Sequence, residues 1–362
     1  MNEHNHYAVI MAGGKGERFW PLSTSQRPKQ LLDLVGDRPL IAQAVERVAS
    51  FIPPERVFVI TNADLVEATC AALPELNPNN ILGEPMGRDT AAAVALGCAL
   101  VEAQDPSAAF AILTADHVMG DLPVFHQTMS DALNKAREED VLITMGIRPT
   151  HPDTGFGYIR VSGPLDGGGD TSFFAVRKFE EKPTLKRAKE FVESGECFWN
   201  SGMFIWSVRS LRKAMLRHCP PLTRLMDLML PHIGKETFEC KLRAEYEHLS
   251  KISIDYALME KADNILMAEG KFKWDDVGSW PALEHHFTPD ESGNTLIGNA
   301  EMLDADRNIV YSRNRLTACV GVSDLIVVQA EGVTLVCAKD RAQDIKLLVK
   351  GMHERGDCQE FL

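Results

Sequence analysis

Residues 7–32 read YAVIMAGGKGERFWPLSTSQRPKQLL, an apolar segment followed directly by a glycine-rich and basic one. The apolar run Tyr7–Ala12 predicts a short buried strand that leads into a loop. Three glycines follow within four positions, at Gly13, Gly14 and Gly16. Because glycine has no Cβ, such a loop lets the main chain approach a ligand closely and present N–H groups to an anion. The stretch therefore predicts a strand with an anion-binding loop at its end.

Two well-known phosphate-binding patterns do not fit this loop. The P-loop requires a lysine and a hydroxyl residue after its last glycine, whereas Gly16 is followed by Glu17. The dinucleotide pattern GxGxxG fits Gly14 and Gly16, but Phe19 occupies the position of its third glycine. That third glycine permits close packing of helix and strand, so its absence argues against an NAD-dependent oxidoreductase.

The loop also carries a local excess of positive charge. Residues 13–29 contain four basic residues and one acid: Lys15, Arg18, Arg27, Lys29 and Glu17. The whole chain, in contrast, has 38 basic and 51 acidic residues and a net charge of −13. A basic loop at a strand end in an acidic protein favours a polyphosphate ligand. The alternative is a flexible glycine turn with solvated basic side chains.

Beyond the loop, short apolar runs alternate with segments of helical periodicity. The predicted strands are 56–61, 109–113 and 141–147, and the predicted helices are 39–51, 62–73, 91–103 and 122–138. Asp89 and Thr90 are the candidates for capping the helix 91–103. This alternation predicts βαβ units and an α/β fold with a Rossmann-like, mainly parallel sheet. Such sheets bind ligands beyond the carboxyl ends of their strands, and we expect both the glycine loop and Asp116 at that edge.

The sequence changes character after residue 150. Between about 150 and 288, candidate strands at 157–161, 173–179 and 202–208 are mixed with helical segments. After Pro289, short alternating apolar segments are separated by Gly, Asn and Asp, and a final helix is predicted at 340–352. This pattern of short alternating segments predicts a small C-terminal β-rich, β-helix-like unit. We therefore expect two domains, residues 1–288 and residues 289–362.

Composition narrows the classes of protein that fit. Hydrophobic residues make up 45% of the 362, which is typical of a globular protein. The acidity argues against a nucleic-acid partner, because no general basic field exists to bind a phosphate backbone. The longest apolar run, Ala91–Val101, is far shorter than the ~20 residues that span a bilayer, so no membrane partner is expected. The eight cysteines form no CxxC pair, and we expect reduced thiols in a cytoplasmic protein.

The glycine-rich segment and seven others resemble one family. AGGKGERFWPLSTSQRPKQLL (12–32) resembles the signature of the sugar-1-phosphate nucleotidylyltransferases, and its WPLS and RPKQLL parts are closest to the mannose-1-phosphate guanylyltransferases. The other matching segments follow in order: GEPMGRDTAAAVAL (83–96), LTADH (113–117), MGIRPTHPDTGFGYI (145–159), FEEKP (179–183), WNSGMFIW (199–206), SIDYALME (253–260) and WDDVGSW (274–280). The resemblance covers about residues 7–290.

The resemblance implies a nucleotidyltransferase domain and a specific reaction. GMP would pass from GTP to α-D-mannose 1-phosphate, giving GDP-mannose and pyrophosphate, by in-line attack of the sugar phosphate on the α-phosphate. Such a reaction needs positive charge rather than a covalent intermediate, and its implied cofactor is Mg²⁺ or another divalent ion. The implied catalytic residues are Arg18, Lys29, Asp116 and Lys182, and the implied metal ligands are Asp116 and Asp276. Asp275 is expected to point to the opposite face and make a structural hydrogen bond.

The resemblance also implies two binding sites. The nucleotide would be bound by Ala12, Gly13, Gly14, Gly16, Arg18, Lys29, Glu84, Gly87 and Arg88. Of these, Glu84, Gly87 and Arg88 are the candidates for reading the base. The sugar phosphate would be bound by Gly157, Glu181, Lys182 and Asn200. Several of these residues also have plainer explanations, since Asp116 could cap a helix, Lys182 could end a strand before a proline, and Asn200 could belong to a turn.

Two other functions stay open at this point. One is a nucleotidylyltransferase for another sugar 1-phosphate or another nucleoside triphosphate. The other is a non-catalytic regulatory protein on the same fold, although the presence of every implied catalytic residue argues against it. The β-rich C-terminal unit shows no evident catalytic residue, and we expect it to pack against the catalytic domain or to form a homodimer contact.

Overall fold

Two structural units make up the chain, and the glycine-rich loop begins at a boundary between them. The computed structural model describes residues 6–165 and 170–362. Unit 1 comprises residues 6–13, 44–115, 119–165 and 170–274, and unit 2 comprises residues 14–43, 116–118 and 275–362. The chain passes from one unit to the other at Gly13–Gly14, Ala115–Asp116 and Trp274–Asp275, among other points. Two short strands, β5 (Val118–Met119) and β11 (Trp274–Asp275), lie at such crossings.

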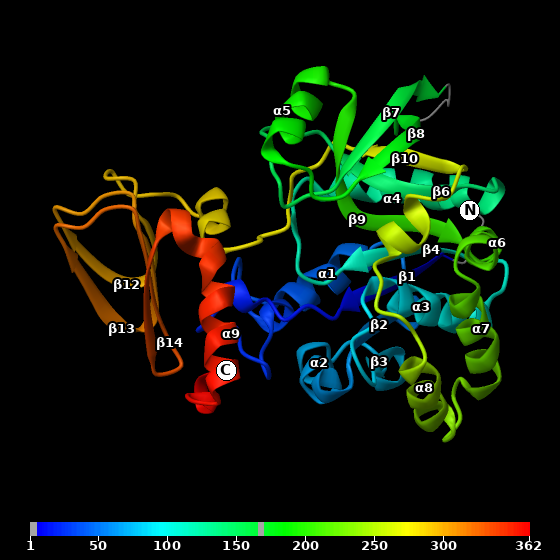
Figure 1. The fold of residues 1–362 in the computed structure, drawn as a ribbon, viewed down its shortest axis with the longest axis horizontal. Coiled ribbons are helices and arrows are strands. Elements are labelled where there is room, and N and C mark those ends of the chain that lie inside the picture. Colours follow the sequence, from blue (N-terminus) through cyan, green and yellow to red (C-terminus); the bar gives the residue numbers. More distant parts are fainter. Residues whose placement is uncertain (1–5, 166–169) are drawn as a thin grey trace. The chain divides into compact units, whose positions relative to one another are not determined.

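Unit 1 is built on a sheet that, among the described residues, has nine strands in the order β3-β2-β1-β4-β9-β6-β10-β8-β7 (Figure 1). They are β1 (His6–Ala12), β2 (Val57–Asn62), β3 (Ile81–Glu84), β4 (Ala109–Thr114), β6 (Leu142–Ile147), β7 (Tyr158–Leu165), β8 (Phe173–Glu180), β9 (Cys197–Ser207) and β10 (Ile265–Gly270). β1 pairs in parallel with β2 and β4, β2 with β3, and β6 with β10. β9 pairs antiparallel with β4 and β6, and β7 with β8. The alternating first 150 residues thus supply most of the parallel pairings, whereas β7, β8 and β9 of the mixed segment pair antiparallel.

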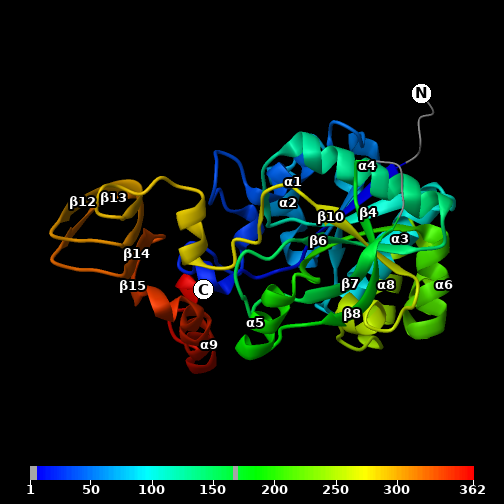
Figure 2. The same cartoon turned by 90° about the horizontal axis from the view of Figure 1, so that it is seen from above.

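Helices cover both faces of this sheet, and in Figure 2 β4 lies between α4 and α3. The helices up to residue 247 are α1 (Leu40–Val48), α2 (Val66–Ala72), α3 (Thr90–Gln104), α4 (Leu122–Glu138), α5 (Leu185–Ser194), α6 (Val208–His218), α7 (Pro220–Met229) and α8 (Phe238–Glu247). The predicted start of α3 is confirmed, because Asp89 accepts a hydrogen bond from the N–H of Thr90 (2.8 Å). Within the described ranges, no helix has both the length and the apolar character that crossing a bilayer requires.

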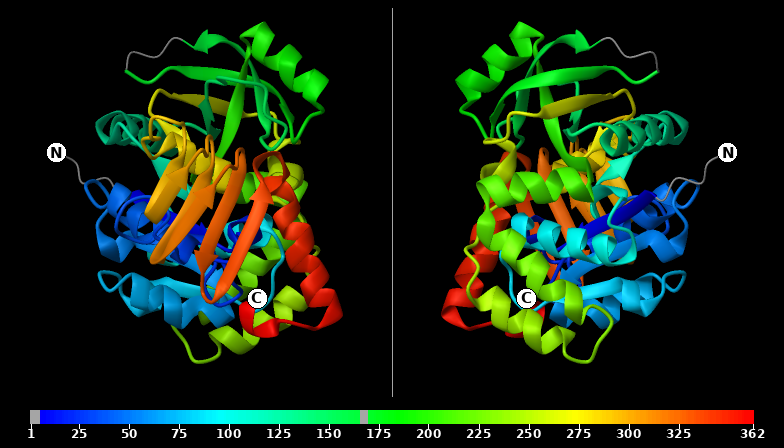
Figure 3. Two further views of the ribbon diagram at one scale, coloured as in Figure 1. Left: turned by 90° about the vertical axis from the view of Figure 1, so that its left-hand side faces the viewer. Right: turned by 90° about the vertical axis from the view of Figure 1, so that its right-hand side faces the viewer.

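The C-terminal part of unit 2 has the predicted β-rich character. Its described strands are β12 (Thr295–Leu303), β13 (Ile309–Val320), β14 (Leu325–Ala330) and β15 (Val333–Ala338), which lie side by side with α9 (Ile345–Arg355) next to them (Figure 3). β12, β13 and β14 are parallel although only short turns connect them, which is the pairing of a β-helix. The buried amide of Asn308 donates to Oδ1 of Asn294 (3.0 Å) and to the carbonyl of Val322 (3.0 Å). These bonds hold successive turns in register.

One hydrophobic core in unit 2 joins the glycine-loop segment to the C-terminal sheet. The rings of Phe19 and Trp280 lie 5.2 Å apart between centroids, and those of Trp280 and Tyr311 lie 5.5 Å apart. Ile345 and Val349 of α9 belong to the same core. Residues 14–43 therefore pack with the C-terminal sheet, and the spatial units cut across the chain-order division at residues 288 and 289.

Candidate active site

The loop after β1 and the residues after β4 leave the same edge of the sheet in unit 1. β1 and β4 are parallel neighbours, with Met11 opposite Thr114. The N–H of Ala115 donates to the carbonyl of Met11 (3.1 Å) and extends the pairing by one residue. Parallel sheets bind ligands beyond this edge, and Gly13 and Asp116 follow it directly in the chain.

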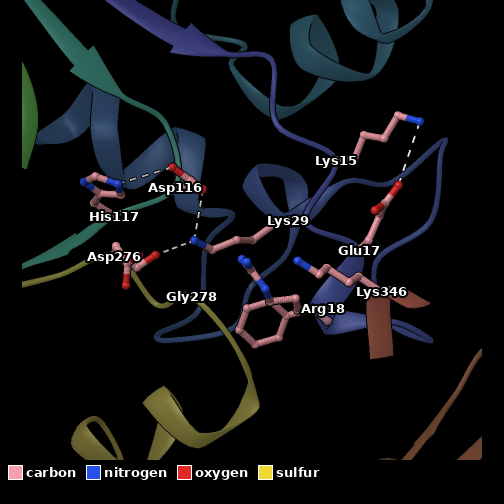
Figure 4. A pocket seen from close by; sticks show the side chains of 11 residues that line it. Lys15, Glu17, Arg18, Lys29, Asp116, His117, Asp276, Gly278 and Lys346 are labelled. Atoms are coloured by element: carbon pink, nitrogen blue, oxygen red, sulfur yellow. Dashed lines mark hydrogen bonds and ion pairs between the residues drawn. The ribbon is translucent and has the colours of Figure 1, made fainter. Parts of the chain in front are cut away.

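A cavity of about 330 Å³ in unit 2 gathers five of the predicted residues (Figure 4). They are Gly16, Arg18, Lys29, Asp116 and Asp276, and they come from three separate segments of the chain. Every residue that lines the cavity belongs to unit 2. Its volume lies within the range of small-molecule sites, roughly 300–1,000 Å³.

Lys29 is a buried lysine that links two of these segments. Only 6% of its side-chain surface is exposed. Its Nζ donates to Oδ2 of Asp116 (2.9 Å) and to the main-chain carbonyl of Asp276 (2.5 Å). A buried ammonium group needs such partners, because removing an unpaired charge from water is costly. Lys29 thereby fixes the carboxylate of Asp116 and the chain at Asp276.

The surroundings of Asp116 keep its carboxyl group charged. Burial raises its pKa, but the charge of Lys29, the charge of His117 and the hydrogen bond from Lys29 outweigh burial and lower the pKa below its ordinary value. Nε2 of His117 lies 3.8 Å from Oδ1 of Asp116. Asp116 is therefore an anion at neutral pH, and its carboxylate faces the cavity.

Asp275 and Asp276 are adjacent in the chain but have different surroundings. Asp275 accepts hydrogen bonds from the N–H of Val277 (2.7 Å), from His285 (2.7 Å) and from His286 (3.1 Å). Burial raises the pKa of Asp275, but the hydrogen bonds from the two histidines and Val277 lower it to about 2. Asp276 lines the cavity instead. Asp275 thus makes the structural hydrogen bonds expected from the sequence.

Arg18 has an unsatisfied polar atom at the cavity. Its Nε is buried and finds no hydrogen-bond partner among the described residues. Figure 4 shows the Arg18 side chain in the cavity, between Lys29 and Lys346. A buried guanidinium N–H without an acceptor is unfavourable, and an oxyanion in the cavity would supply that acceptor.

The donor set of the cavity suits a hard cation that takes few protein ligands. No group of three or more His, Cys, Asp or Glu side chains able to hold a metal ion occurs in the described part of the chain. Asp116 and Asp276 supply two carboxylates to one cavity. Mg²⁺ is commonly bound by one or two carboxylates together with substrate phosphates and water. The two aspartates therefore fit Mg²⁺ better than they fit zinc, which takes three or four protein ligands.

A second group of predicted residues meets in unit 1. Gly157 precedes β7, Glu181 follows β8, and Asn200 lies in β9. The N–H of Asn200 donates to the carbonyl of Gly157 (2.8 Å). A Cβ on residue 157 would clash with Oε2 of Glu181, so glycine leaves the space that this carboxylate occupies. Nζ of Lys182 lies 3.3 Å from Oε1 of Glu181.

Asp255 belongs to the same group, although the sequence analysis did not single it out. It begins the π-helix Asp255–Met259, and its Oδ1 accepts a hydrogen bond from Nδ2 of Asn200 (2.8 Å). The hydroxyl of Thr144 donates to Oδ1 of the same amide (3.2 Å), so the orientation of Asn200 is fixed. Burial and the charge of Glu181 raise the pKa of Asp255 to about 6. An acid within the mostly apolar segment SIDYALME was the available sequence signal.

The residues expected to read the base lie near α8. Glu84 is buried and accepts a hydrogen bond from the hydroxyl of Tyr246 (3.1 Å). Burial raises the pKa of Glu84 to about 7 against the lowering effect of this hydrogen bond. Arg88 donates to the main-chain carbonyls of Tyr246 (2.8 Å) and Glu247 (3.1 Å). The guanidinium group of Arg88 is thus tied to the end of α8.

The remaining predicted residues are small and lie in loops or at a strand end. Ala12 ends β1, and its carbonyl accepts a hydrogen bond from the hydroxyl of Thr61 (3.2 Å). Gly13, Gly14 and Gly87 are exposed. A Cβ on residue 13 would lie 3.8 Å from Oε2 of Glu84, so the loop and the base-reading segment come close within unit 1.

Two protein families and several individual proteins match most of the chain. The profile of the Nucleotidyl transferase family matches residues 7–292, and that of the MannoseP isomerase/GMP-like beta-helix domain matches residues 298–352. The chain is 35% identical to mannose-1-phosphate guanylyltransferase RfbM of Salmonella typhimurium, over 98% of this chain and 73% of that one. It is 34% identical to alginate biosynthesis protein AlgA of Pseudomonas aeruginosa, over 96% and 72%.

One solved structure resembles nearly the whole chain. A crystal structure from Thermus thermophilus, described as a mannose-1-phosphate geranyltransferase, superposes with a TM-score of 0.85 at 36% identity. The match covers 96% of this chain and 99% of that one. Both the sheet of unit 1 and the C-terminal β-rich region therefore have counterparts in one known protein.

Proposed function

Since the chain belongs to the mannose-1-phosphate guanylyltransferase family, we propose that the residues gathered in the two units carry out the family's reaction. In that reaction GMP passes from GTP to mannose 1-phosphate, giving GDP-mannose and pyrophosphate. The observation that carries the assignment of residues is the link through Lys29, which joins the glycine-loop segment to Asp116 and to the chain at Asp276. This link puts two carboxylates and the basic loop around one cavity.

The cavity of unit 2 would bind the triphosphate of GTP. Arg18 offers an unpaired, buried Nε–H, and Lys29 offers its positive charge. The main chain of Gly14 and Gly16 would contribute N–H groups or close approach to the same phosphates, and Ala12 and Gly13 are further proposed nucleotide-binding residues. Arg18 and Lys29 would then offset the charge that builds up on the attacked phosphate and the departing pyrophosphate.

The two aspartates are the proposed ligands of a divalent cation. Nucleotidyltransferases of this kind are typically metal-dependent, and we propose Mg²⁺, or another divalent ion, bound by Asp116 and Asp276. Bound there, the ion would neutralise phosphate charge and help to align the α-phosphate. Lys29 keeps Asp116 charged and positioned for this role.

The group around Asn200 is the proposed site for mannose 1-phosphate. Lys182 would bind its phosphate, while Glu181 and Asp255 would accept hydrogen bonds from sugar hydroxyls. Asn200, held by Thr144 and Asp255, would donate its remaining amide N–H to the sugar. Gly157 leaves room for the Glu181 carboxylate and would let the main chain approach the sugar. Glu84, Gly87 and Arg88 are the proposed base-reading segment.

The chemical step needs no proton transfer by a side chain. An oxygen of the sugar phosphate is already ionised at neutral pH, and it attacks the α-phosphorus of GTP. A new P–O bond forms, the bond between the α-phosphorus and the αβ-bridging oxygen breaks, and pyrophosphate leaves with the electron pair. The contribution of the protein is to hold the two anions together and to balance their charge.

A grid of substrates tests this proposal. Pyrophosphate release is measured with Mg²⁺ for four nucleoside triphosphates against the 1-phosphates of mannose, glucose and N-acetylglucosamine. We expect turnover confined to GTP with mannose 1-phosphate. Turnover with a different pair of nucleoside triphosphate and sugar 1-phosphate would overturn the proposed specificity. Folded protein that releases no pyrophosphate with any pair would favour a non-catalytic regulatory role.

A further inference from the structure

The cavity contains a basic residue from the C-terminal unit that the sequence analysis did not consider. Lys346 is the second residue of α9 and lines the cavity together with Arg18 and Lys29. Ile345, Val349 and Met352 bury one face of α9 in the core of unit 2. That packing leaves Lys346 outside the core, and Figure 4 shows its side chain directed toward Arg18.

Lys346 has no acidic partner in the part of the protein that the structure describes, unlike the basic residues close to it in the chain. Lys339 pairs with Glu284 (2.8 Å), and Lys350, one turn further along α9, pairs with Glu354 (3.6 Å). Arg341 pairs with Asp344. Within residues 6–165 and 170–362, the ammonium group of Lys346 forms no ion pair or hydrogen bond. Its charge is therefore available to a ligand in the cavity.

The two aspartates of the cavity lie apart from Arg18 and Lys346, and the third acid of its lining, Glu17, pairs with Lys15 (3.9 Å). Figure 4 shows Asp116 and Asp276 on one side of Lys29, and Arg18 followed by Lys346 on the other. Two cations that face one cavity repel each other unless an anion lies between them. An extended polyphosphate with a metal ion at one end matches this order, because its far end would meet Arg18 and Lys346.

We propose that Lys346 binds the terminal phosphates of GTP, and the pyrophosphate that leaves, as a further substrate-binding residue. This inference rests on the proposed function of the cavity. The α-phosphate would lie toward Asp116 and Asp276, and the β- and γ-phosphates toward Arg18 and Lys346. The C-terminal β-rich unit thus contributes a side chain to the reaction as well as a hydrophobic core for the glycine-loop segment.

The test compares two lysines on the same helix. Lys346→Met removes the charge and keeps an unbranched side chain, and Lys350→Met is the matched control outside the cavity. Steady-state constants are measured for GTP and mannose 1-phosphate in the forward direction and for pyrophosphate in reverse, together with inhibition by GMP. We expect Lys346→Met to raise the KM for GTP and for pyrophosphate about tenfold, the effect of one lost charge-assisted hydrogen bond. The KM for mannose 1-phosphate, inhibition by GMP and every constant of Lys350→Met should stay within about twofold of wild type.

A third variant separates failure of this inference from failure of the proposed function. If Arg18→Met raises the KM for GTP while Lys346→Met leaves the KM for GTP and pyrophosphate within about twofold, the role of Lys346 is overturned and the cavity keeps its role. If neither variant changes these constants, both the role of Lys346 and the assignment of the cavity to the triphosphate are wrong. Because Lys346 is exposed, thermal unfolding of its variant should match that of the wild type.

Discussion

Glu84 is a carboxyl group whose ionisation falls near neutral pH. Burial raises its pKa to about 7, the hydrogen bond from Tyr246 lowers it, and the charge of Asp89 raises it. Guanine offers N–H donors, which an ionised carboxylate accepts and a protonated carboxyl group accepts less well. In the folded protein without ligand, Glu84 is therefore mostly protonated below pH 7, and a bound guanine would favour its ionised form.

The pH dependence of GTP binding tests this role of Glu84. We expect the KM for GTP to fall as the pH rises from about 6 to 8, because Glu84 ionises over this range. Glu84→Gln should weaken GTP binding at pH 8 and flatten this part of the profile. The γ-phosphate of GTP also titrates here, but its effect is common to both proteins. Parallel KM profiles for the wild type and Glu84→Gln would rule Glu84 out as the base reader.

The same shift predicts how Glu84 affects folding. Its pKa is raised in the folded state above the ordinary value of 4.5, so the folded protein binds the proton more tightly than the unfolded chain does. The stability contributed by this proton is fully present below about pH 4.5 and is lost as the pH rises through 7. The Glu84→Gln variant should lack this loss, which urea unfolding at a series of pH values would measure.

The glycine-rich loop is the element in which backbone shape matters most. Gly16 has a φ of 65°, in the left-handed region, and a Cβ there would clash with the Cβ of Lys29 and lie 3.0 Å from its backbone nitrogen. A Cβ on residue 14, in contrast, would meet no other atom within 4 Å. The two glycines therefore serve different purposes, since Gly16 allows the turn against Lys29 and Gly14 leaves open space.

Alanine substitutions at these glycines should separate the two purposes. Gly16→Ala would cost about 1–2 kcal/mol from the left-handed backbone alone, with a further cost from the displaced Lys29. It should lower the melting temperature by several degrees and raise the KM for GTP. Gly14→Ala should change the unfolding free energy by no more than about 0.5 kcal/mol. Equal melting temperatures for the two variants would contradict this account of the loop.

Local pattern was enough to predict most elements and part of the site. The strand before Gly13, the cap at Asp89 and the position of Asp116 after β4 all follow from short stretches of sequence. The contact between Asp255 and Asn200 does not, because it joins residues 55 positions apart through a π-helix. The hydrogen-bond partners of Arg88 could not be predicted either, since they are main-chain carbonyls that no side-chain pattern reveals.

At the scale of the whole molecule, the domains that follow one another along the chain differ from the two units that pack together in space. The two family profiles divide the chain between residues 292 and 298, close to the boundary that we propose at residues 288 and 289. The core of unit 2 nevertheless combines Phe19 with Trp280 and with Tyr311 of the C-terminal sheet. Sequence reasoning missed this arrangement and Lys346 for one reason, because both depend on packing between segments more than 250 positions apart.

The most direct test of the central claim is the Mg²⁺ dependence of pyrophosphate release by Asp276→Asn, with GTP and mannose 1-phosphate as substrates. We predict that the variant melts like the wild type and loses about a hundredfold or more in turnover, because the cavity keeps its shape but loses a metal-binding charge. Near-normal turnover with the ordinary Mg²⁺ dependence would remove Asp276 from the metal site and contradict the assignment of the cavity to metal-assisted transfer.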